Sequence, residues 1–142
     1  MTTVRQLIHE KGAEVITVRP EDTVLEAITK MADHNVGSVL VMNGTRLSGI
    51  FTERHYARNV FLKGRSSPDT RVGEIMAERV VCATPDQTVE ECMAVMTDKA
   101  VRHLPVLEGN QLVGVVSIGD LVKSIISDQK FVIEQLEHYI SG

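Results

Sequence analysis

Residues 15–24 read VITVRPEDTV, and residues 80–89 read VVCATPDQTV. Both stretches place a β-prone run ahead of a proline and a threonine, at an offset of 65 residues. The register extends without a gap over residues 15–59 and 80–124, with identical pairs spread along it. A match of this length predicts that the chain is a tandem repeat of one supersecondary unit.

The first half of each copy has the pattern of a strand followed by a helix. Strands are expected at residues 15–18 and 80–83, each ended by a proline. The capping boxes Thr23-x-x-Glu26 and Thr88-x-x-Glu91 start the helices that follow. Apolar residues then recur at i, i+3, i+4 and i+7, which predicts one buried face per helix.

The second half of each copy predicts a β-hairpin and another helix. Turn residues stand between apolar runs at Asn43-Gly44 and at Gly109-Asn110, and helices are expected after Thr52 and Ser117. A short apolar segment leads into each first strand. The segment of the first copy carries about three extra residues near Lys11, because the leading segments match at an offset of 68 instead of 65.

Length and composition restrict the classes of protein. The 142 residues suffice for one ordinary domain or two small units sharing a core, and 43% hydrophobic with 24% charged residues excludes a disordered chain. The net charge of -4 gives no general attraction for nucleic acid or an anionic membrane. No apolar run predicts a membrane span or a secretory signal. Two cysteines form neither a disulfide framework nor a zinc site, so we expect a cytoplasmic protein without a metal.

The predicted fold class is α/β (α+β), with two β-α-β-β-α units at residues 1–66 and 67–127 packed around a pseudo-twofold axis. A single unit of that size buries too little apolar surface to be stable alone. Residues 128–142 are expected to form a C-terminal amphipathic helix, which needs its own body or a second chain to pack on. Its apolar side carries Val132, Leu136, Tyr139 and Ile140.

Chemistry-bearing residues gather where the last strand of the second copy meets its helix, in the stretch GVVSIGD at residues 114–120. Unpaired N–H groups at such a junction favour a phosphate. Ser117 offers a hydroxyl, Gly119 allows close approach, and the Asp120 carboxylate can accept both hydrogens of a ribose cis-diol. The same Ser117-x-x-Asp120 pattern also fits a plain helix cap, and the residues alone leave both readings open.

The whole pattern resembles a tandem pair of CBS (cystathionine β-synthase type) domains. The resemblance covers essentially the entire chain, including the stretch VRHLPV at residues 101–106 and GVVSIGD at 114–120. It is strongest to small stand-alone bacterial CBS-pair proteins. It implies a disc-like homodimer that binds adenosine nucleotides such as AMP, NAD, ATP or S-adenosylmethionine in clefts between the two copies.

The resemblance also assigns residues to two clefts. The first cleft would combine one junction with the first strand and hairpin of the other copy, using Ile16, Thr17, Val36, Gly37, Ser38, Val115, Ser117 and Asp120. The backbone of Ile16 and Thr17 would read the adenine edge. The second cleft, or a set of phosphate contacts, would use Ile50, Thr52, Arg54, His55, Val81, Val101, Arg102 and His103.

The second cleft departs from the family pattern at His55, where the ribose-binding Asp is expected. A neutral imidazole accepts one hydrogen bond and a protonated one accepts none, so His55 cannot hold both diol hydroxyls. The basic residues Arg54, Arg102 and His103 nevertheless suit phosphates. Arg54, and more so Arg58, also fit a solvated helix face.

These observations favour a non-enzymatic nucleotide sensor that couples an adenosine ligand, AMP or NAD first and then ATP or S-adenosylmethionine, to its conformation or to a protein partner. The alternative is a structural dimerisation module with vestigial clefts. No catalytic cofactor is expected. No acid, base and nucleophile converge in the sequence, and Cys82 and Cys92 fit core positions better than nucleophiles.

Overall fold

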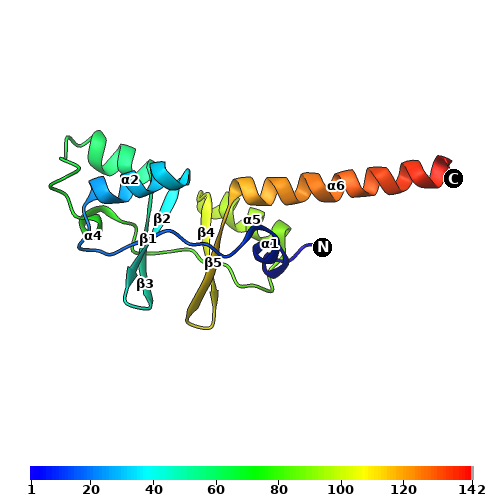
Figure 1. Cartoon of the computed structure of the whole chain (residues 1–142), viewed down its shortest axis with the longest axis horizontal. Coiled ribbons are helices and arrows are strands. Elements are labelled where there is room, and N and C mark those ends of the chain that lie inside the picture. The colour runs from blue at the N-terminus through cyan, green and yellow to red at the C-terminus, as the bar shows by residue number, and fades with distance from the viewer. Residues whose placement is uncertain (142) are drawn as a thin grey trace.

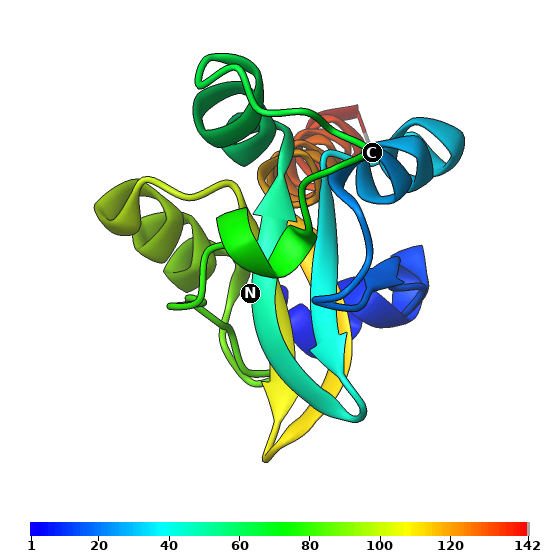
Figure 2. The same ribbon diagram turned by 90° about the vertical axis from the view of Figure 1, so that its left-hand side faces the viewer.

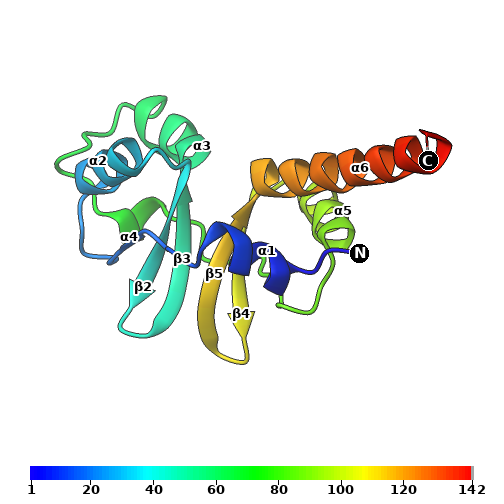
Figure 3. The ribbon, with the colours of Figure 1, turned by 45° about the vertical axis from the view of Figure 1, so that its right-hand side comes forward.

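The structure, a computed structural model, describes residues 1–141. Two β-hairpins stand side by side, with the helices at residues 24–34 and 53–56 on the outer side of the first hairpin and those at 89–99 and 118–141 on the outer side of the second (Figures 1 and 3). Viewed from one end, the two sheets lie one behind the other (Figure 2). This arrangement confirms the predicted α/β fold with two repeated units and a C-terminal helix.

The first copy contains three strands in the order β1-β2-β3, with β1 parallel to β2 and β3 antiparallel to it. Its elements are β1 (Thr17–Val18), α2 (Val24–His34), β2 (Ser38–Asn43), β3 (Arg46–Thr52), α3 (Glu53–Tyr56) and the π-helical turn η1 (Ala57–Phe61). The Thr23 side chain caps α2 by accepting from Glu26 N–H, but the return bond from Thr23 N–H to Glu26 is not formed, so the predicted capping box is only half present. Val24, Ala27 and Met31 are buried, as the pattern predicts.

The second copy repeats this order around the antiparallel pair β4-β5. Its elements are α5 (Val89–Lys99), β4 (His103–Glu108), β5 (Gln111–Ser117) and α6 (Ile118–Ser141). The capping box of Thr88 and Glu91 is complete at the start of α5, and Val89, Cys92 and Met96 form its buried face.

The strand predicted at residues 80–83 is wrong in its extent, because only Ala83 pairs, in an isolated parallel bridge to Val106. The repeat explains the loss. In the first copy, Leu40 N–H donates to Ile16 O at 3.0 Å. The matching donor in the second copy is Pro105, which has no N–H, so the carbonyl of Val81 gains no ladder partner there.

The leading segments cross between the copies. Helix α1 (Val4–Lys11) packs Val4 and Leu7 into the core of the second copy. Helix α4 (Val72–Ile75) packs Val72 and Ile75 into the core of the first. The expected units 1–66 and 67–127 therefore exchange their leading helices, and neither core is complete without the other copy.

The second helix of the second copy and the expected C-terminal helix are one element. Helix α6 runs unbroken from Ile118 to Ser141, so the boundary expected at 127–128 falls inside it. Leu121 is fully buried, whereas residues 126–141 are all exposed and the end of the helix projects away from the body (Figure 1). No helix among residues 1–141 is both long enough and apolar enough to cross a membrane.

Two buried glycines at matching repeat positions allow the leading segments to approach the hairpins. A Cβ on Gly49 would stand 2.8 Å from Ala77 O, a backbone atom, and 2.6 Å from Met76 Sδ. A Cβ on Gly114 would meet only the Ile8 side chain, at 2.9 Å. The close approach is thus held by backbone in the first copy and by a movable side chain in the second.

We expect Gly49→Ala to lower the free energy of unfolding by about 1 to 3 kcal/mol, as overpacking does in a core that cannot shift. Gly114→Ala is the matched control and should cost clearly less, because Ile8 can change rotamer. Urea denaturation of both variants measures the difference. Equal losses would contradict the assignment of the clash to the Ala77 backbone.

Candidate functional site

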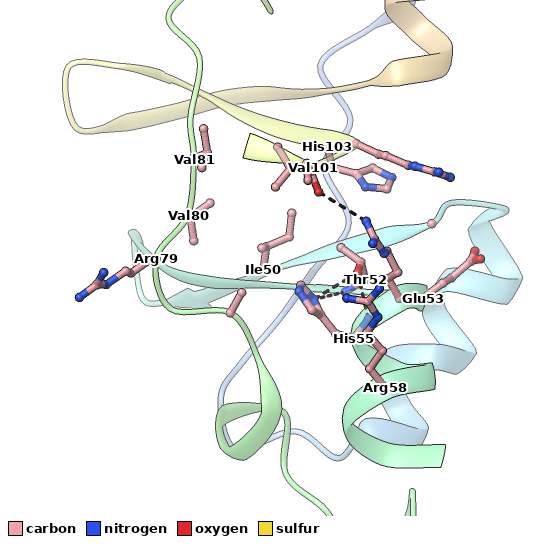
Figure 4. Close-up of a pocket in the computed structure, with 15 residues that line it drawn as sticks. Ile50, Thr52, Glu53, His55, Arg58, Arg79, Val80, Val81, Val101 and His103 are labelled. Carbon is pink, nitrogen blue, oxygen red and sulfur yellow. Dashed lines mark hydrogen bonds between the residues drawn. The ribbon is translucent and has the colours of Figure 1, made fainter. Parts of the chain in front are cut away.

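A cavity of about 400 Å³ lies between the two copies. Its walls come from the end of β3 and the start of α3 on one side, and from the segments that precede α5 and β4 on the other (Figure 4). The lining residues are Gly37, Ile50, Thr52, Glu53, Arg54, His55, Arg58, Ala77, Arg79, Val80, Val81, Ala100, Val101, Arg102 and His103. The structure therefore brings together all eight residues that the family resemblance assigns to the second cleft.

The apolar part of the cavity is formed by Ile50, Val80, Val81 and Val101. Ile50 is held in place by two backbone hydrogen bonds, because Ile50 N–H donates to Ala77 O and Ala77 N–H donates to Ile50 O, both at 3.0 Å. The chain that follows α4 thereby forms one wall of the cavity. Such an apolar wall suits the face of a flat ring better than a charged group.

His55 caps its own helix at the edge of the cavity. Thr52 N–H donates to His55 Nδ1 at 3.1 Å, and His55 N–H donates to Thr52 Oγ1 at 3.2 Å. Because a backbone N–H only donates, Nδ1 must be the unprotonated nitrogen, and the neutral ring carries its proton on Nε2. The tautomer of His55 is thus set by the backbone of Thr52.

The rim of the cavity is strongly basic. Four arginines line it, against a single acidic side chain, that of Glu53. Arg54 makes a long hydrogen bond of 3.4 Å to Ala100 O. Within residues 1–141, Arg58, Arg79 and Arg102 form no ion pair. An anion placed here would meet positive charge that no carboxylate already neutralises.

Both histidines of the cavity are biased toward the neutral state. Burial, and then the charges of Arg54 and Arg58, lower the pKa of His55 below its usual value. Burial also lowers the pKa of His103, against the opposing pull of Glu53 and Asp120. At neutral pH both rings therefore act through single N–H donors and single acceptors.

In the first cleft, a lysine side chain lies at the position proposed for the ligand's ribose. Ser117 N–H donates to Asp120 Oδ2 at 2.9 Å, and Asp120 N–H donates to Ser117 Oγ at 3.2 Å. The side chain of Lys11, at the end of α1, reaches the same carboxylate, with its Nζ 3.0 Å from Asp120 Oδ2 and 2.8 Å from Val115 O. An ammonium group thus lies against the carboxylate that the sequence assigns to a ribose diol.

The ionisation of Asp120 follows from these contacts. Burial raises its pKa, but the N–H of Ser117 and the ammonium of Lys11 outweigh burial, and the net pKa lies below the usual value. The carboxylate is therefore charged at neutral pH. Its side chain keeps only 24% of its surface exposed, so the contact with Lys11 is partly shielded from solvent.

The remaining residues assigned to the first cleft lie at β1, at the start of β2 and in β5. Ile16 O accepts from Leu40 N–H, and Thr17 O accepts from Lys30 Nζ at 2.9 Å, so both carbonyls already have partners. Ser38 is buried in β2, and Val36 is half-buried just before it. Gly37 lines the His55 cavity, where a Cβ would lie 3.3 Å from His103 Nε2.

Sequence reasoning missed Lys11, Glu53 and Arg79, and it favoured a solvated surface for Arg58. A signal for Lys11 was present in the three additional residues of the first leading segment. Arg79 follows the second leading segment, and nothing in a linear pattern shows that this segment forms a wall of the opposite copy's cleft.

Metal and thiol chemistry find little support at either cleft. Residues 1–141 contain no cluster of three or more His, Cys, Asp or Glu side chains that could hold a metal ion. Burial, with a smaller effect of Glu91, raises the pKa of Cys92 to about 11, and burial also raises that of Cys82. Both thiols are therefore protonated at neutral pH and are poor nucleophiles.

The CBS domain model matches residues 4–61 and 72–127. A CBS domain-containing protein of Arabidopsis thaliana, CBSX3, described as mitochondrial, is 36% identical over 99% of this chain and 73% of its own length. A solved structure with CBS domains from Burkholderia ambifaria MC40-6 is 50% identical, covers 90% of this chain and 96% of its own, and superposes with a TM-score of 0.87.

A more distant structure extends the likeness in fold alone. The CBS domain pair of protein MJ0100, solved in complex with 5′-methylthioadenosine and S-adenosyl-L-methionine, is 21% identical and superposes with a TM-score of 0.79. It covers 90% of this chain and 98% of its own. Two matched domains, a shared repeat and a relative aligned over nearly the full chain agree, and the protein belongs to the CBS-domain family.

Proposed function

We propose that the chain is a non-enzymatic regulatory module that binds adenosine nucleotides in the clefts between its two CBS units. The cavity between the copies is the observation that carries the proposal: it has the volume of a small-molecule site, an apolar wall and a basic rim. The adenosine ligands named for the MJ0100 pair support the same ligand class. We further propose that the clefts bind AMP or NAD more tightly than ATP or S-adenosylmethionine.

The Asp120 cleft is proposed to hold the ribose of a nucleotide with a free diol. A charged carboxylate is the acceptor that two hydroxyl groups need, and Ser117 fixes its orientation through two hydrogen bonds. Lys11 occupies that acceptor first. Lys11 Nζ and Ser117 N–H both contact Oδ2, so a diol competes with the lysine at that oxygen, whereas Oδ1 keeps its lone pairs. At Oδ2, only the surplus over the lysine contact contributes to affinity.

The alternative is a structural dimerisation module whose clefts no longer bind. Two observations favour it: the contact between Lys11 and Asp120, and the apolar surface of α6, which is suited to a second chain. The two proposals differ in one measurable property, the binding of a nucleotide. They share the prediction of a homodimer, and both allow a further protein partner.

The homodimer is proposed from the projecting part of α6. Large apolar side chains there are more than half exposed: Phe131, Val132, Ile133, Leu136, Tyr139 and Ile140. An apolar stripe of this length on a helix without neighbours is unfavourable in water, and a second copy offers the same stripe in return. A cytoplasmic location, inferred from the two unpaired cysteines, belongs to the proposal as well.

Replacing Asp120 with Ala should weaken AMP binding by about 2 to 4 kcal/mol, or roughly 30-fold to 1,000-fold, since two hydrogen bonds to a charged acceptor are lost. Isothermal titration calorimetry on the folded variant measures this. Asp33→Ala removes the same charge from an exposed position on α2 and should leave the affinity unchanged. An unaltered affinity in Asp120→Ala would remove Asp120 from the site and favour the structural module.

Replacing Lys11 with Met should strengthen the binding of adenosine, because its diol would no longer compete with an ammonium group. A partly buried ion pair contributes about 1 kcal/mol, so the gain should be roughly fivefold. Lys63→Met, at an exposed position in the linker, is the matched control. Calorimetry that shows adenosine binding equally well or more weakly in Lys11→Met would show that this contact does not oppose the ligand.

Multi-angle light scattering at micromolar concentration should give the mass of two chains. Leu136→Glu should shift the protein toward the monomer, because a charge would have to be buried in the apolar interface. Ser127→Glu adds the same charge to the same helix about two and a half turns away, on the opposite side, and should not. A wild-type protein that is monomeric throughout would refute the dimer.

A further inference from the structure

The two clefts present opposite hydrogen-bonding character at the same repeat position. His55 and Asp120 each accept the backbone N–H at the start of their helix, from Thr52 at 3.1 Å and from Ser117 at 2.9 Å. A carboxylate that accepts one N–H keeps further lone pairs for a ligand. A neutral imidazole that accepts one N–H has only a donor left, the N–H of Nε2.

This remaining donor is available to a ligand. Within residues 1–141, His55 Nε2 has no hydrogen-bond partner, and no side-chain nitrogen or oxygen is both buried and unpartnered. Nε2 must therefore be reachable from outside, and His55 is one of the residues that line the cavity (Figure 4). A donor suits the oxygen of an anion, whereas a carboxylate at this position would suit the hydroxyls of a diol.

Positive charge surrounds the donor. Arg54 and Arg58, one residue before and three residues after His55, lie close enough for their charges to act on its ring. Arg102 lines the same cavity from the second copy. Guanidinium groups bind phosphate oxygens in pairs, and dinucleotide sites use the same exchange, in which a carboxylate meets a free ribose hydroxyl and an arginine meets a ribose phosphate.

We propose that the His55 cleft binds an adenosine nucleotide whose ribose carries a phosphate at its 2′ or 3′ position, with His55 Nε2–H, Arg54 and Arg58 contacting that phosphate. The inference rests on the proposed nucleotide-binding function and gives the second cleft its own ligand class. The base would lie against Ile50, Val81 and Val101. The two clefts of one chain would then separate free-diol nucleotides from ribose-phosphorylated ones.

Three isomers of the same composition test the proposal: ADP, adenosine 2′,5′-bisphosphate and adenosine 3′,5′-bisphosphate. The bisphosphates carry up to one more negative charge than ADP, and the arginine variants below separate that general effect from a phosphate site. Calorimetry on the wild-type protein should show one bisphosphate binding about tenfold or more tightly than ADP. AMP is titrated in parallel. If AMP and all three isomers fail to bind, the proposed function fails; if AMP or ADP binds and neither bisphosphate binds more tightly than ADP, only this inference fails.

Substitutions of His55 test whether the preference for a bisphosphate over ADP arises in the His55 cleft. His55→Asp should reverse it, because the new carboxylate repels a phosphate and accepts a diol. His55→Asn keeps both an acceptor for Thr52 N–H and a donor for the ligand, so it should retain the preference and guards against a folding defect in His55→Asp. A preference for bisphosphate that survives unchanged in a folded His55→Asp would overturn the assignment.

Two arginine variants distinguish a specific phosphate contact at the cleft from a general effect of the protein's positive charge on affinity. Arg58→Ala should lower the affinity for the bisphosphate about tenfold and leave that for AMP within about twofold. Arg46→Ala removes the same charge from the exposed hairpin of the first copy, outside the cavity, and should change neither affinity. Equal effects of the two substitutions would contradict a phosphate site at Arg58.

Discussion

The exchange of leading helices between the two copies is the constraint on which the rest of the molecule depends. Val4 and Leu7 of α1 complete the core of the second copy, and Val72 and Ile75 of α4 complete that of the first. Each helix leads into a cleft: Lys11 is the last residue of α1, and Ala77 follows α4 by two residues. The packing that stabilises the fold therefore also decides which groups reach each cleft, and a shift of either helix would disturb core and cleft together.

The difference between the clefts begins with the three additional residues of the first leading segment. In the first copy, Ile50 exchanges two backbone hydrogen bonds with Ala77, which leaves the cavity open beside it. At the matching position of the second copy, Val115 O accepts instead from Lys11 Nζ. A backbone partner has thus been replaced by a long cationic side chain. Because an ammonium group has three donors, the same lysine also reaches Asp120, and one cleft carries an internal occupant that the other lacks.

Much of the fold could be predicted from the sequence, since its signals are local: the repeat, the threonine caps at Thr23 and Thr88, and the turns at Gly44 and Gly109. The strand before α5 could not, because its loss depends on a proline in a different strand, Pro105. All eight residues that the family resemblance assigned to the second cleft do line the cavity. Lys11 and Arg79 escaped prediction because contacts between the copies follow from the crossing of the leading segments, which has no linear signature.

The junctions at Thr52 and Ser117 show how a duplicated site can diverge without cost to the fold. In this form of helix capping, the third residue of the helix needs only one hydrogen-bond acceptor, for the backbone N–H of the N-cap residue. Asp and His both meet that demand, so either residue leaves the helix intact. What the side chain presents beyond its acceptor is left unconstrained by folding: lone pairs in one case, an N–H in the other. The fold thus fixes where this residue stands and leaves the polarity of the cleft to a single substitution.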